Sequence, residues 1–147
     1  MGTTGLVRRE LGEEECRALL AGTSRGHLAF TRSAMPAISP VRFVLDGGRV
    51  VIPTRPDSDH VPPAGGAVVV LGVDGTDGPD GQPDWAVTVV GPVRTVHGAA
   101  DLAACDALGW PVAPVPGDGH GYVVLTVGMV SGWRTEPADA AVRRRSA

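Results

Sequence analysis

The alternation of apolar and polar residues is clearest in the stretch Ala37–His60, where it predicts a β-hairpin with a polar end. Two apolar runs flank Asp46-Gly47-Gly48, and Asp-Gly and Gly-Gly pairs favour hairpin turns because those turns need positive φ angles. The second run leads into Thr54, Arg55 and Ser58, which bring hydroxyls and a guanidinium close to free backbone N–H groups. This combination is typical of a seat for an anionic group such as phosphate. The alternative interpretation is an ordinary solvated loop.

Shorter patterns elsewhere predict further strands and two helices. Acidic residues 13–15 begin a helix whose apolar residues follow i, i+3, i+4 spacing, and this helix ends near Gly22. A second helix is predicted over Ala99–Leu108. Gly91-Pro92 predicts a bulge, a bend or an edge, because proline cannot donate to a strand ladder. Besides the hairpin, the predicted strands are His27–Thr31, Ala67–Val73, Trp85–His97 and Tyr122–Trp133, with a turn over residues 33–35.

These elements predict a mainly β fold in one domain. About six strands carry two short helices, and this order favours a six-stranded antiparallel barrel over a doubly wound sheet. A chain of 147 residues is long enough to bury a core in a single domain. We expect a flexible lead-in over residues 1–9, the barrel domain over residues 10–134 and a polar tail over residues 135–147.

Composition narrows the classes of function. Lysine is absent, which excludes Schiff-base chemistry on a side-chain amine and with it covalent pyridoxal phosphate catalysis. A net charge of −3 gives no general attraction to nucleic acid. No apolar stretch approaches the ~20 residues of a membrane span, and no signal peptide is recognisable, so we expect a cytoplasmic protein without membrane contact. Cys16 and Cys105 fall in apolar helical patterns and are interpreted as core residues rather than as a disulfide or reactive thiols.

Common catalytic and metal-binding motifs are missing from the sequence. The four histidines are far apart and none has a second ligand nearby, so no metal site is expected. The chain has no G-x-S-x-G elbow, P-loop or Rossmann fingerprint. Its paired carboxylates lie in Gly/Pro-rich stretches, which is typical of solvated turns. No general acid or base is identified, so the catalytic residues are unknown and the polar end of the hairpin is the best candidate site.

Several motifs follow one another in a fixed order along residues 10–134. They are the helix GEEECRALLAG, the strand GHLAF, a P-x-I-x-P-V strand, the hairpin LDGGRVVIPTRPDS, the strand DWAVTVVGPVRTV and the closing GYVVLTVGMVSGWR. This ordered set resembles the pyridoxamine 5′-phosphate oxidase-like, FMN-binding split-barrel family. The resemblance implies a six-stranded split β-barrel that works as a homodimer, with two cofactor clefts at the subunit interface.

The resemblance also implies which residues contact the cofactor. The P-x-I-x-P-V strand lays its backbone along the flavin ring, and the threonine and serine of the hairpin bind the phosphate. Arginine and histidine side chains nearby are candidates for contacting an anionic cofactor or substrate, and the partner subunit closes the site from a later strand. The residues so assigned are Ile38, Ser39, Pro40, Val41, Arg42, Thr54, Arg55, Ser58, His60, Trp85 and Val87.

Two positions depart from the family pattern. Asp59 follows the loop serine where relatives usually carry a basic residue, and Ala37 stands where the family often has arginine. A carboxylate in place of an ammonium changes a contact with an anion by about 1–4 kcal/mol. The resemblance therefore implies an FMN-dependent oxidoreductase acting on a small organic molecule. The alternatives are the same fold with deazaflavin F420, haem or no cofactor, or a non-catalytic ligand-binding dimer.

Overall fold

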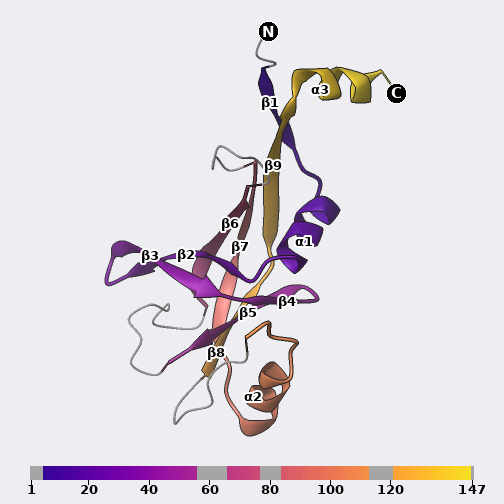
Figure 1. The fold of residues 1–147 in the computed structure, drawn as a ribbon. Helices are drawn as coiled ribbons and strands as arrows, with labels where there is room; N and C mark the ends of the chain where they lie inside the picture. The colour runs from indigo at the N-terminus through magenta and orange to yellow at the C-terminus, as the bar shows by residue number, and fades with distance from the viewer. Residues whose placement is uncertain (1–4, 56–65, 77–83, 113–120, 147) are drawn as a thin grey trace.

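The computed structural model describes residues 5–55, 66–76, 84–112 and 121–146, which form a mainly β fold with three short helices (Figure 1). None of the helices in these ranges is long and apolar enough to cross a membrane. The elements in chain order are β1 (Leu6–Glu10), α1 (Glu13–Ala21), β2 (Arg25–Arg32), β3 (Met35–Arg42), β4 (Val44–Asp46), β5 (Arg49–Thr54), β6 (Val68–Gly75), β7 (Trp85–Thr95), α2 (Ala99–Asp106), β8 (Gly121–Thr126), β9 (Met129–Pro137) and α3 (Ala138–Arg145).

All described strand pairs are antiparallel and follow the order β3-β2-β6-β7-β8-β5-β4, while β9 pairs with both β7 and β1. The sheet curls so that β3, at one end of this order, lies beside β5, the next-to-last strand at the other end (Figure 1). The predicted mainly β, antiparallel barrel architecture is therefore confirmed. The described residues divide into nine strands, because the expected closing strand splits into β8 and β9 and because β1, β3 and β4 are separate strands.

The two ends of the chain form regular structure that the hydrophobic pattern does not indicate. β1 lies in the expected lead-in and pairs with β9 along its whole length. α3 lies in the expected polar tail. Alanine is the best helix former, and the three arginines 143–145 stand in the last turn, where they complement the negative end of the helix dipole.

β7 changes partners at Gly91-Pro92, which is the interruption that this pair predicts. Up to Val90 the strand pairs with β9, and from Val93 onward it pairs with β8. A Cβ atom at Gly91 would overlap the carbonyl oxygen of Thr126 and lie 3.1 Å from the backbone nitrogen of Gly128. The chain between β8 and β9 therefore rests directly on the backbone of β7, and glycine is needed for this close approach.

The buried apolar side chains form a main core and a smaller second one. The main core lies between α1 and the inner face of the curled sheet and includes Leu28, Phe43 and Leu71. The second core lies under α2 and is centred on Tyr122, which stacks on Trp110 with ring centroids 5.9 Å apart. The Tyr122 hydroxyl donates a hydrogen bond to Asp106 on α2. Burial, with this hydrogen bond, raises the pKa of Tyr122 and keeps the phenol protonated.

Both cysteines are free and buried, Cys16 in the main core and Cys105 in the second core. Burial raises the pKa of each thiol, and a thiol with a raised pKa holds little of the reactive thiolate at neutral pH. We expect the native protein to react slowly with a disulfide reagent and the urea-unfolded chain to react at both thiols promptly. Absorbance of the released thiol measures both rates. Fast reaction of one native thiol would contradict the core interpretation.

Candidate functional site

The sheet is split between β3 and β5, which do not pair with each other. Much of the candidate site lies at this split. In the described part of the chain, β3 pairs only with β2, and β5 pairs with β8 and β4. β3 and β5 nevertheless lie side by side. The structure thus brings together two segments that the sequence assigns to one site, the P-x-I-x-P-V strand and the second strand of the hairpin.

The outer edge of β3 presents backbone groups that no described strand satisfies. The Phe43 N–H donates to the Ser24 carbonyl at 3.0 Å, which makes this residue pair a hydrogen-bonded one at the end of the β2–β3 ladder. Hydrogen-bonded and non-hydrogen-bonded pairs alternate along an antiparallel ladder. Ile38, Pro40 and Arg42 therefore occupy non-hydrogen-bonded positions and turn their backbone groups toward the split. Pro40 has no N–H, so the edge offers donors only at Ile38 and Arg42 among these three residues.

The side chains of β3 divide between the two faces of the sheet. Ser39 is only 3% exposed, and its hydroxyl donates to the Pro40 carbonyl at 3.4 Å. Val41 packs against the main core. Ile38, in contrast, is 70% exposed and Pro40 is also exposed. Side-chain contacts with a ligand at this strand therefore come from Ile38 and Pro40, while the backbone groups of Ser39 and Val41 are used in pairing with β2.

The end of β5 supplies a hydroxyl and a guanidinium. Thr54 is half-buried and pairs with Gly121, so its side chain continues the inward-facing line of Val50 and Ile52. Arg55 follows immediately and is exposed. Within the described residues the Thr54 hydroxyl makes no hydrogen bond, so it can accept or donate to a ligand.

Arg42 stands directly opposite Arg25 of β2, a residue that the sequence pattern did not single out. Like charges directly opposite each other on neighbouring strands destabilise a sheet, most of all in a non-hydrogen-bonded pair, where side chains are closest. Arg42 is half-buried, and its Nη1 donates to the Val112 carbonyl at 3.3 Å. Neither arginine has a carboxylate partner among the described residues. An anion between them would remove the repulsion.

Four predicted site residues are not among those at the split that the structure describes. Ser58 and His60 fall outside the described residues, and so does Asp59, which differs from the family pattern. Trp85 and Val87, at the start of β7, are 6% and 0% exposed and belong to the main core of this same chain. A contact from these two side chains to a cofactor held by another subunit stays a prediction.

The described site is equipped for binding an anionic, planar ligand rather than for proton transfer. Its groups are the backbone edge of β3, the Thr54 hydroxyl and arginine side chains. His27 of β2 is exposed and stands opposite Pro40. The described ranges contain no group of three or more His, Cys, Asp or Glu side chains suited to a metal ion.

Known proteins were compared with this chain in sequence and in fold. A family model described as pyridoxamine 5′-phosphate oxidase matches residues 12–132. An uncharacterized protein of Mycobacterium tuberculosis is 35% identical over 98 residues, which are 64% of this chain and 64% of that protein, so the match spans slightly less than two thirds of the relative. An FAD-binding protein of Mycobacterium smegmatis is similar in structure, with a TM-score of 0.73 and 26% identity over 88% of this chain and 98% of that one. An FAD- and heme-binding protein of the same organism shares the fold, with a TM-score of 0.68 and 20% identity over 94% of this chain and 80% of that one.

Proposed function

Because the chain belongs to the pyridoxamine 5′-phosphate oxidase family, we propose that it binds FMN at the split between β3 and β5 and acts as an oxidoreductase on a small organic molecule. The observation that carries this proposal is the outer edge of β3, which pairs with no described strand and lies beside β5, the strand that ends at Thr54. Fold alone does not determine function, whereas the groups at this edge can contact a ligand directly.

The residues at the split fit a flavin. A flavin ring presents alternating hydrogen-bond donors and acceptors along one edge, and the outward N–H and C=O groups of Ile38 can pair with them. The Thr54 hydroxyl and the guanidinium groups of Arg42 and Arg55 are suited to the phosphate. When bound, the flavin supplies hydride or electron transfer, while the chain binds and orients it and excludes water.

We also propose that the protein is a homodimer formed through the outer face of the sheet. Strand register places Ile38, Ala29, Val70, Val90 and Met129 side by side in one row across β3, β2, β6, β7 and β9. The two ends of this row are 70% and 71% exposed. Exposed apolar rows of this extent mark interaction surfaces.

A second copy of the chain is the occupant that suits this face. Ile38 belongs both to the apolar row and to the edge of β3 that faces the split. A copy seated on the row therefore also covers one side of a ligand bound along β3, which excludes water from it. Isologous pairing of one patch with itself is the commonest way in which soluble chains assemble.

Replacing Thr54 with alanine is expected to weaken FMN binding by about 0.5–3 kcal/mol, the range from an ordinary hydrogen bond to one with a charged group. Thr126→Ala is the matched control, because Thr126 is an exposed threonine at the opposite end of the β5–β8 ladder. Flavin fluorescence titration measures both affinities. Equal affinity of the Thr54 variant and the unchanged protein would place the phosphate elsewhere.

Deazaflavin F420 is the second candidate, favoured by the Arg25–Arg42 pair. Two adjacent guanidinium groups on β2 and β3 suit a ligand with more negative charge than a single phosphate. The absorbance spectrum and the mass of the ligand released from the purified protein distinguish FMN, F420 and haem. A colourless protein that binds none of them in titration would contradict the cofactor proposal as a whole.

A further inference from the structure

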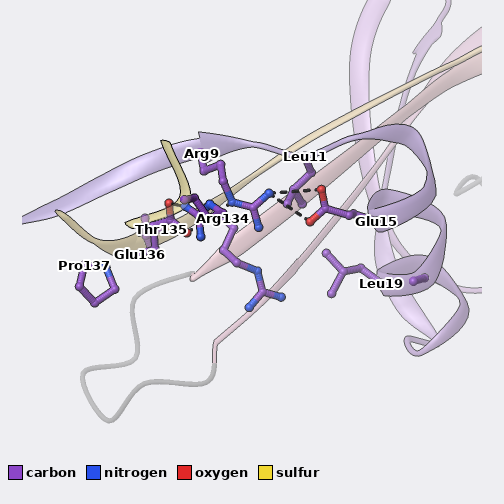
Figure 2. A pocket seen from close by; sticks show the side chains of 10 residues that line it. Arg9, Leu11, Glu15, Leu19, Arg134, Thr135, Glu136 and Pro137 are labelled. Atoms are coloured by element: carbon purple, nitrogen blue, oxygen red, sulfur yellow. Dashed lines mark hydrogen bonds and ion pairs between the residues drawn. The ribbon is translucent and has the colours of Figure 1, made fainter. Parts of the chain in front are cut away.

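A pocket of about 550 Å³ lies away from the split, on the arm formed by β1 and β9 (Figure 2). Its walls come from β1, β9, α1 and α3, so it joins the two ends of the chain. The charged side chains that line it are Arg9, Arg134, Arg144, Glu15 and Glu136.

The two glutamates form ion pairs with two of the three arginines. Arg9 donates from Nη1 to Glu15 at 3.1 Å and from Nε to Glu136 at 3.4 Å. Arg144 of α3 forms an ion pair with Glu136, whose side chain is only 9% exposed. The N–H of Gly12 and the Arg9 guanidinium lower the pKa of Glu15, which keeps this carboxylate charged.

Arg134 is the cation without a carboxylate partner among the described residues. It stands directly opposite Arg9 in the β1–β9 register, so two like charges face each other on neighbouring strands. Figure 2 shows its guanidinium extending below the Arg9–Glu15 pair, where its charge also helps to lower the pKa of Glu15 without forming an ion pair with it. The lining contains three arginines and two glutamates, so its side chains carry a net charge of one positive unit.

The opposite part of the lining is apolar. Leu11 lies between β1 and α1, and Leu19 and Ala18 come from α1. Leu19 packs against the edge of the main core. A ligand that places its charge at Arg134 therefore meets an apolar wall with the rest of its body.

We propose that this pocket binds a small organic carboxylate with an apolar body, and that Arg134 pairs with the carboxylate. A guanidinium forms two parallel hydrogen bonds with a carboxylate, which makes it the suitable partner for this group. The bound anion also offsets the repulsion between Arg9 and Arg134. Because Arg144 belongs to α3 and lines the same pocket, occupation of the pocket holds α3 against β9.

Benzoate is the probe for this site, measured by calorimetric titration of the full chain in its as-isolated form. Benzyl alcohol has the same apolar body without the charge, and inorganic phosphate has charge without the body, so both are expected to bind more weakly. Arg134→Gln is expected to weaken benzoate binding roughly ten- to a hundredfold, because it removes a hydrogen-bonded charge pair. Arg134→Lys keeps the charge and is expected to lie in between.

Arg143→Gln is the matched control, since it removes one positive charge from α3 at a residue outside the pocket lining. It is expected to leave benzoate affinity unchanged, and benzoate is expected to slow hydrogen exchange of the α3 amides. Three results would overturn the proposal: benzyl alcohol binding as tightly as benzoate, equal affinity of Arg134→Gln and the unchanged chain, or displacement of benzoate by FMN. The last result would place benzoate in the split between β3 and β5.

Discussion

Replacing Gly91 with alanine is expected to lower the free energy of unfolding by about 3 kcal/mol or more, the upper end of what overpacking costs. The added methyl group would overlap the Thr126 carbonyl, which is backbone and cannot rotate away. Relief requires β7 or the chain between β8 and β9 to shift. The Gly128 N–H donates to the Val90 carbonyl at 3.0 Å, so such a shift also strains the hydrogen bond that joins these two segments.

Urea denaturation followed by tryptophan fluorescence measures this effect, because tryptophans lie both on the paired strands β7 and β9 and in the second core. Gly48→Ala is the matched control, since a Cβ atom at Gly48 has no other atom within 4 Å. This variant is expected to unfold at nearly the same urea concentration as the unchanged protein. A Gly91→Ala midpoint equal to that of Gly48→Ala would show that the β8–β9 connection does not press on β7.

Replacing Met129 with aspartate is expected to dissociate the proposed dimer. The side chain is 71% exposed in the single chain and lies at the β9 end of the apolar row. A second copy on this face would bury an unpaired carboxylate, which costs at least about 3 kcal/mol, or more than a hundredfold in Kd. Light scattering over a dilution series measures the dissociation constant.

Val142→Asp is the matched control for the dimer. Val142 is 59% exposed but lies on α3, away from the apolar row. It is expected to leave the dissociation constant unchanged, and FMN affinity is expected to fall only in the Met129 variant, because loss of the partner uncovers the ligand. An unchanged chain that is monomeric at all concentrations, or a Met129→Asp dimer of normal strength, would contradict the proposed interface.

Local signals explain which elements were predictable from the sequence. The turn at Asp46-Gly47-Gly48 joins β4 and β5 as expected, and Gly47 adopts a φ of 60° that suits glycine. The β2–β3 turn carries no such signal, because its positive φ angles belong to Ser33 and Ala34. The sequence predicted a turn over residues 33–35, but it did not predict that β3 pairs with β2.

Features that depend on pairing between distant segments were not predictable. β1 has the sequence LVRRE, which has little strand character of its own and forms a strand because β9 pairs with it. Strand register places Arg25 opposite Arg42 and Arg9 opposite Arg134. A shift of the register by one residue would separate both pairs. The sequence thus indicated the hairpin half of the candidate site, whereas the second arginine and the arm pocket needed the structure.

The edge of β3 also bears on how the chain resists aggregation. An unpaired strand edge is a template on which another chain can add a strand. Pro36 and Pro40 both occupy positions whose backbone faces outward, so two of the four donors that the outer edge would otherwise offer are missing. A strand from another chain would form an incomplete hydrogen-bond ladder along this edge. The ring of a small ligand, in contrast, needs only the backbone groups around Ile38. The same two prolines therefore let the edge accept a small ligand and discourage polymerisation through it.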